Sequence, residues 1–189
     1  MIRPRSTRAI AILCVSVAAV ALAACSSSSP SSTTAPTTAP VITAPPTTVA
    51  LPPVSTTGAV PAVASPTDQG VEPVISADTA PAPSTDVIKD LVVGTGATTT
   101  LSDTVDVMYV GALYTTGVDF DQSTWQAKMP TAFPLNEVVP GFAQGLEGMK
   151  VGGRREIVIP AALGYGAMPP QGIPANATLV FVVDLKSLS

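Results

Sequence analysis

The residues best suited to form a binding site in this chain are its aromatic ones, and they are confined to one part of it. The four Phe, three Tyr and single Trp all lie between Tyr109 and Phe181, and the 189-residue chain contains no histidine. Aromatic side chains bury large apolar areas and can enclose a rigid, water-poor pocket. Without imidazole chemistry, such a pocket would act through shape and desolvation.

Several common kinds of catalytic site are excluded by residue types that the sequence lacks. A Ser-His-Asp or Cys-His hydrolase needs a histidine base, and zinc sites rely on Cys and His. The Gly94-Thr95-Gly96 segment precedes neither a helix nor the lysine of a phosphate-binding loop, so it is interpreted as a turn. We therefore expect neither a metal ion nor a cofactor.

The N-terminus has the pattern of a secretory signal. Three arginines precede an apolar run over residues 9–24. This run is shorter than a membrane-spanning helix, which needs about 20 apolar residues. The run ends at Cys25 and resembles the lipobox of bacterial lipoproteins. The resemblance implies a signal peptide over residues 1–24 and an extracytoplasmic protein anchored to the membrane through lipidated Cys25. An uncleaved anchor, or an ordinary signal with a chance cysteine, is the alternative.

Removal of the signal would leave an acidic chain without a free thiol. Cys14 leaves with the signal and Cys25 would be acylated, so no disulfide, metal site or thiol nucleophile would remain. Loss of three arginines takes the formal charge from −4 to about −7, which argues against a nucleic-acid partner.

Residues 25–85 are predicted to form a disordered tether after the lipidated cysteine. The segment consists mainly of Ser, Thr, Ala, Pro and Val, with Asp68, Glu72 and Asp78 as its only charged residues. Prolines remove backbone donors, and the apolar area is too small to offset the entropy of ordering. We expect an extended, partly polyproline-II spacer. A glycosylated or wall-spanning stalk is the alternative.

A single α+β domain is predicted over residues 86–189. Phe142, Leu146 and Met149 have helical spacing behind Pro140, which suits the first turn of a helix. Interspersed glycines make this helix weak by propensity, so packing must hold it. Alternating or continuous apolar residues predict strands over residues 87–93, 104–113, 154–159 and 178–185. The expected fold is an antiparallel sheet curled over one short helix.

Short motifs run through this domain in a characteristic order. They are Tyr109-Val110-Gly111, Gly117, Phe120-Asp121, residues 138–142, Gly145-Leu146, Gly148-Met149, Val151-Gly152, Gly164-Tyr165-Gly166, Ile173-Pro174 and residues 176–181. Their order and spacing resemble the FKBP-type peptidyl-prolyl cis-trans isomerases, over essentially all of residues 86–189 and none of the chain before. The family fold is a five- or six-stranded antiparallel half-barrel wrapped around a short α-helix.

The resemblance implies roles for individual residues of a proline-binding pocket. Phe142 would form the floor, where most of the family has Trp, and Tyr165 and the Val139 N–H would donate hydrogen bonds to ligand carbonyls. Asp121 matches the pocket carboxylate of the family, with a turn residue as the alternative. The implied catalytic residues are Tyr109, Phe120, Asp121, Tyr165 and Phe181. The implied substrate-binding residues are Phe142, Val138, Val139, Ile173 and Glu137, the last at the rim.

The sequence departs from the family pattern after Asp121. Many members place there an arginine that can pair with the aspartate, whereas residues 122–126 contain none and only Lys128 could reach back. A wall aromatic of some relatives falls near Thr131, which would leave that side more open. Three aromatic residues receive no role from the resemblance: Tyr114, Trp125 and Phe133.

The implied activity is isomerisation of Xaa-Pro bonds in extracytoplasmic polypeptides, which assists their folding. Rotation about a peptide bond has a barrier of ~18–20 kcal/mol because it breaks amide resonance. An apolar pocket disfavours the charge-separated planar amide, so the reaction needs neither a nucleophile nor a metal. The implied partners are proline-containing segments and macrolides such as tacrolimus or rapamycin, and we expect a monomer. The alternatives are an FKBP-fold binding or chaperone module with little isomerase activity, and a surface protein that only docks a partner.

Overall fold

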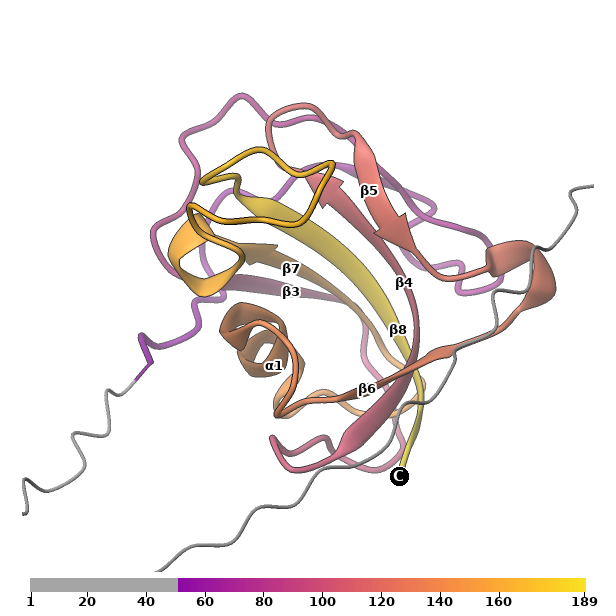
Figure 1. Ribbon diagram of the computed structural model, residues 1–189. Helices are drawn as coiled ribbons and strands as arrows, with labels where there is room; N and C mark the ends of the chain where they lie inside the picture. The colour runs from indigo at the N-terminus through magenta and orange to yellow at the C-terminus, as the bar shows by residue number, and fades with distance from the viewer. Residues whose placement is uncertain (1–50) are drawn as a thin grey trace, which may run out of the picture. The chain divides into compact units, whose positions relative to one another are not determined.

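The computed structural model describes residues 51–189, so the predicted signal peptide, Cys25 and the first part of the tether lie outside the described residues. Its main sheet has the strand order β3-β7-β8-β4-β5, and β6 also pairs with β4 (Figure 1). The strands are β3 (Val87–Val92), β4 (Thr104–Leu113), β5 (Asp119–Gln122), β6 (Thr131–Pro134), β7 (Arg154–Ile159) and β8 (Leu179–Leu188). All of these pairings are antiparallel.

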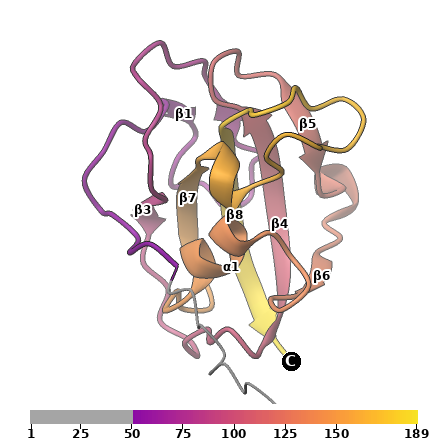
Figure 2. The same ribbon diagram turned by 60° about the vertical axis from the view of Figure 1, so that its left-hand side comes forward.

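The sheet curls around one short helix, α1 (Pro140–Leu146), as Figures 1 and 2 show from two directions. Register shifts interrupt the pairing of β4 with both β5 and β8, and such bulges increase the local bend and twist of a sheet. Two 3-10 turns, η1 (Trp125–Ala127) and η2 (Ala161–Leu163), complete the elements of the domain. The predicted α+β fold, an antiparallel sheet of five or six strands around one short helix, is confirmed, and the sheet has six strands.

The core between α1 and the sheet follows the predicted alternation. Val105, Val107 and Tyr109 of β4 share one buried cluster with Phe142 and Leu146 of α1. The alternate residues of β8 join the same cluster: Leu179, Phe181, Val183 and Leu185. Each predicted face of these two strands therefore lies against the helix.

Gly145 explains how a helix of weak propensity is held in place. A Cβ atom at this position would lie 2.5 Å from Cγ2 of Ile157 on β7, far inside van der Waals contact. The missing side chain therefore lets α1 approach the sheet closely. Pro140 occupies the first turn of the helix, as expected, where its missing N–H leaves no hydrogen bond unmade.

The prediction of a disordered tether up to residue 85 is wrong for residues 51–85, which we name the N-terminal strap. The strap contains the hairpin β1 (Val63–Ala64) and β2 (Val74–Ile75). It is attached to the domain by backbone hydrogen bonds, among them Ile88 N–H to Ser55 C=O at 2.9 Å and Asp78 N–H to Tyr114 C=O at 2.9 Å.

The strap is ordered because the outer face of the sheet is also apolar. Ile75 is 2% exposed and belongs to a second cluster with Tyr114, Val158 and Val180, against which Val63 also packs. The few apolar residues of the strap therefore bury sheet residues that water would otherwise reach. Within residues 51–189, no helix has the length and apolar character needed to cross a membrane.

Candidate functional site

A cavity of about 280 Å³ lies on the helix-bearing side of the sheet. Nine residues line it: Tyr109, Asp121, Phe133, Glu137, Val138, Val139, Phe142, Tyr165 and Phe181. Eight of the ten predicted site residues are in this set. The other two, Phe120 and Ile173, pack against the same core cluster without lining the cavity.

The aromatic rings of the cavity pack edge to face. The centroid of Phe142 lies 5.1 Å from that of Phe181 and 6.0 Å from that of Phe133, each pair at an interplanar angle of 72°. Tyr109 contacts Phe133 at 5.4 Å in the same manner. This geometry favours the ring quadrupoles and fixes the rings relative to one another. The result is a preformed apolar surface that includes Phe142, which is only 5% exposed.

Phe133 is the cavity residue that the sequence prediction missed. β6 pairs with β4 so that Phe133 lies opposite Val105, an inward-facing core residue, and it therefore points to the same side. It lines the side near Thr131 that was expected to be more open. The alternation in Thr131-Ala132-Phe133 is the only local signal, since the register of so short a strand is set by its partner.

Two hydrogen bonds hold the Asp121 carboxylate in place. The Tyr109 hydroxyl donates to its Oδ2 at 2.7 Å, and the Gln122 N–H donates to its Oδ1 at 2.9 Å. Among residues 51–189, neither Lys128 nor any other cation forms a salt bridge with Asp121. The Tyr109 hydroxyl therefore orients the Asp121 carboxylate.

The environment keeps both tyrosines of the cavity protonated. Burial, followed by the hydrogen bond and the negative charge of Asp121, raises the pKa of Tyr109 well above its usual range. Burial and the charge of Asp121 also raise the pKa of Tyr165. Both hydroxyls are consequently hydrogen-bond donors at neutral pH.

Two donors at the cavity remain available for a ligand. Val139 caps α1 in an extended conformation, and its N–H has no protein acceptor within the described part of the chain. The Tyr165 hydroxyl likewise forms no hydrogen bond to residues 51–189 and is half-buried in the cavity wall. An apolar floor with two free donors suits an uncharged ring flanked by carbonyl groups.

Comparison with known proteins agrees with this geometry. Residues 96–186 match the model of the family described as FKBP-type peptidyl-prolyl cis-trans isomerase. The chain is 41% identical over 116 residues to the probable FK506-binding protein of Corynebacterium glutamicum, covering 61% of this chain and 98% of that protein. It is 45% identical over 105 residues to the FK506-binding protein of Streptomyces anulatus, covering 53% of this chain and 84% of that protein.

Solved structures show the same fold. A peptidyl-prolyl cis-trans isomerase from Pseudomonas syringae pv. tomato superposes with a TM-score of 0.50 at 35% identity, over 54% of this chain and 74% of that one. FkpA from Escherichia coli superposes with a TM-score of 0.52 at 35% identity, over 65% of this chain and 53% of that one. The fold, the cavity and these matches lead to one conclusion: the chain belongs to the FKBP-type peptidyl-prolyl cis-trans isomerase family.

Proposed function

We propose that this chain catalyses cis–trans isomerisation of Xaa-Pro bonds in extracytoplasmic polypeptides and thereby assists their folding. The observation that carries the proposal is the preformed aromatic cavity with two donors, the Val139 N–H and the Tyr165 hydroxyl, that have no acceptor among residues 51–189. A proline ring fits the apolar floor, and the carbonyls beside it would accept the two hydrogen bonds. Catalysis is non-covalent, because only a rotation about the peptide bond is required.

The rate enhancement arises from tighter binding of the twisted amide than of either planar form. The planar amide is the more charge-separated species, so a water-poor cavity disfavours it relative to the twisted one. Phe142 would seat the ring while the two donors hold the carbonyls in place, which limits motion to the reacting bond. Each tenfold gain in rate requires ~1.4 kcal/mol, which a few such contacts can supply.

The polar pair at the cavity wall would hold the substrate amide in register. Asp121 is exposed, yet the Tyr109 hydroxyl fixes one of its oxygens at 2.7 Å. Phe120 supports the wall from behind, since its ring packs edge to face against Phe181 at 5.6 Å. Ile173 completes the apolar surroundings and Glu137 lies at the rim. We assign these residues to catalysis and binding as part of the proposal.

We further propose that the protein is a membrane-anchored lipoprotein that acts as a monomer. The N-terminal arginines, the apolar run and Cys25 support cleavage and acylation at that cysteine. Residues 26–50 would then be the spacer between the lipid and the strap. At ~3.1 Å per residue for a polyproline-II chain, this spacer would reach at most about 80 Å.

A protease-coupled assay with an Ala-Leu-Pro-Phe peptide separates this function from its nearest alternative. The purified chain should accelerate conversion of the cis peptide in proportion to its concentration. An FKBP-fold binding module would instead bind the peptide, as judged by calorimetry, without accelerating its conversion beyond the rate in buffer. That second result would replace the proposed enzyme by a binding or chaperone module.

A further inference from the structure

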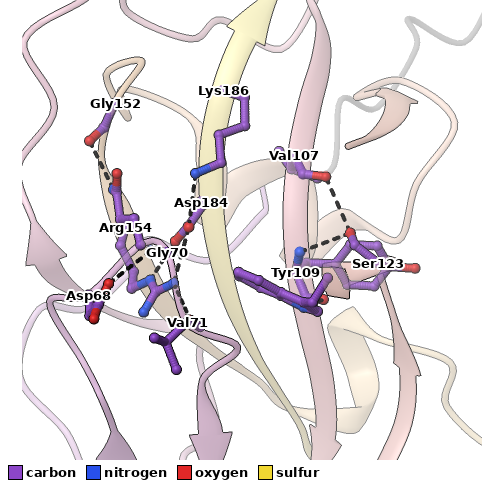
Figure 3. A network of polar contacts seen from close by, with 12 residues as sticks. Asp68, Gly70, Val71, Val107, Tyr109, Ser123, Gly152, Arg154, Asp184 and Lys186 are labelled. Atoms are coloured by element: carbon purple, nitrogen blue, oxygen red, sulfur yellow. Dashed lines mark hydrogen bonds and ion pairs between the residues drawn. The ribbon is translucent and has the colours of Figure 1, made fainter. Parts of the chain in front are cut away.

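The backbone of Tyr109 lies at an edge of β4 that no strand within residues 51–189 covers. β5 pairs with β4 as far as Gln122, and β6 begins only at Thr131. Ser123 fills the gap: its N–H donates to the Tyr109 C=O at 3.0 Å, and its Oγ accepts from the Tyr109 N–H at 3.0 Å (Figure 3). The same Oγ donates to the Val107 C=O at 3.3 Å. A serine side chain thus replaces a strand partner.

Trp125 supplies a second donor to the same carbonyl. Its Nε1–H donates to the Tyr109 C=O at 3.2 Å, so both lone pairs of that oxygen are used. Tyr109 is the residue whose hydroxyl holds Asp121 in the cavity. Ser123 and Trp125 therefore fix the backbone of the residue that orients the pocket carboxylate, although neither lines the cavity.

Arg154 holds the indole ring of Trp125 from the outer face of the sheet. Its guanidinium carbon lies 5.8 Å from the ring centroid, within the range of a cation–π contact. A second cavity of about 270 Å³, also lined by Lys128 and Lys186, borders the indole. Because the side of the indole that faces this cavity is not closely packed, the contact with Arg154 is needed to fix the orientation of the ring.

The N-terminal strap in turn fixes Arg154. The fully buried guanidinium forms a bidentate pair with Asp184 and uses two further N–H groups on two strap carbonyls. It donates to the Ser65 C=O at 2.8 Å. It also donates to the Val71 C=O at 3.2 Å (Figure 3). Asp68 shapes the strap between these carbonyls by accepting the Gly70 N–H at 2.9 Å. This part of the strap lies outside the residues that match the family model.

We propose that Trp125 and Arg154 are positioning residues for the Tyr109–Asp121 pair, and that the N-terminal strap completes the active site from the far side of the sheet. The route runs from the strap carbonyls through Arg154 and the Trp125 indole to the Tyr109 backbone. It crosses the sheet there, since Trp125 belongs to the outer cluster and Tyr109 to the inner one. The inference rests on the proposed isomerase function.

Trp125→Phe in the full chain tests the route, because it keeps an aromatic ring next to Arg154 and removes the indole N–H together with the five-membered ring that carries it. We expect kcat for an Ala-Leu-Pro-Phe peptide to fall about tenfold, the equivalent of one lost hydrogen bond. KM should stay within about twofold, because the floor and the two ligand donors are untouched. Arg154→Lys should act in the same direction, since an ammonium group cannot match the planar fork that serves Asp184 and both carbonyls.

Gln69→Ala is the matched control. Gln69 belongs to the same part of the strap and lines the second cavity with Trp125, but its side chain donates to the Gly152 C=O at 2.9 Å and forms no hydrogen bond to Arg154, Trp125 or Tyr109 within residues 51–189. Its kcat should equal that of the wild type. An unchanged kcat in Trp125→Phe, or an equal loss in Gln69→Ala, would overturn the inference.

Amide hydrogen exchange provides a readout that needs no substrate. The Tyr109 N–H of Trp125→Phe should exchange about tenfold faster than in the wild type, while that of Val182 in β8 stays unchanged. Equal exchange at Tyr109 in both proteins would refute the route even if the chain is an active enzyme. An inactive wild type would instead refute the proposed function, and the Tyr109 exchange ratio would still decide whether Trp125 holds this segment.

Discussion

At the scale of single residues, the site combines one fixed polar pair with an apolar base. Tyr109 both packs its ring in the aromatic cluster and donates its hydroxyl to Asp121. Phe142, the proposed floor of the cavity, offers a flat face without a polar atom, where an indole would add an N–H. We expect the polar pair to affect catalysis and Phe142 to affect ligand affinity, and single substitutions can separate the two effects.

Tyr109→Phe should reduce activity with little effect on stability. The change removes only the hydroxyl that orients Asp121, so we expect kcat/KM to fall about tenfold. Because Asp121 is exposed and stays solvated, the free energy of unfolding should change by less than about 1 kcal/mol. Asp121→Asn and the double variant close a thermodynamic cycle. If the two losses simply multiply in the double variant, Tyr109 and Asp121 do not act as a pair.

Phe142→Leu should weaken ligand binding more strongly than it lowers kcat. Leucine keeps the apolar character and loses the flat ring, so the Kd for tacrolimus should rise about tenfold, or ~1.4 kcal/mol. Met149→Leu is the control, since Met149 lies in the same core cluster but does not line the cavity. Titration calorimetry of both variants checks the prediction. Similar Kd values for the two would remove Phe142 from the floor.

At the scale of elements, the outer face of the sheet contains a buried carboxyl group, that of Glu156. Glu156 of β7 is fully buried, and its carboxyl oxygens have no hydrogen-bond partner within residues 51–189. Burial, opposed in part by Lys89 and assisted by Asp78, raises its pKa to about 7 from an ordinary 4.5. On the helix side of the sheet, burial also raises the pKa of Asp86, whose carboxyl lies beside Gly141 of α1, to about 6.

The stability of the domain should therefore fall as the pH rises from about 4.5 to about 7. In this window the unfolded state releases the Glu156 proton while the folded state retains it, so deprotonation favours unfolding. The contribution of protonated Glu156 to the free energy of unfolding is fully present below pH 4.5, and up to about 3 kcal/mol of it is lost by pH 7. Urea unfolding of the wild type and Glu156→Gln across this window measures the difference. Parallel pH profiles of the two proteins would contradict the assignment, since Asp86 is common to both.

The elements that could be predicted from the sequence are those whose own residues determine them. β4 and β7 have the predicted bounds, and α1 begins at Pro140 as expected. β6 was not predicted because four residues ending in a proline carry too weak a pattern, and its register depends on β4. Phe133 was missed as a cavity residue for the same reason.

At the scale of the whole molecule, composition alone gave the wrong boundary between tether and domain. The strap has no aromatic residue, yet it is ordered because the sheet offers it an apolar outer face and the buried Arg154 needs its carbonyls. Such long-range contacts leave no trace in the local sequence. The isomerase unit consequently begins well before residue 86, within the segment interpreted as a spacer.

Cys25→Ser should release the protein from the membrane. The serine cannot form the thioether to diacylglycerol, and the remaining spacer is too polar to bind a bilayer by itself. We expect the wild type in the membrane fraction and the variant in the soluble extracytoplasmic fraction, with equal isomerase activity per molecule. Membrane attachment that persists in the variant would show that an uncleaved apolar segment is the anchor.

The most direct test of the proposed catalysis is exchange NMR spectroscopy of an Ala-Leu-Pro-Phe peptide at equilibrium, with and without the full chain. We expect the full chain to shorten the cis–trans exchange time of the peptide from tens of seconds to the subsecond range. When tacrolimus fills the cavity, the exchange rate should return to the rate in buffer. Exchange that stays at the buffer rate, or that tacrolimus leaves accelerated, would contradict catalysis in this aromatic cavity.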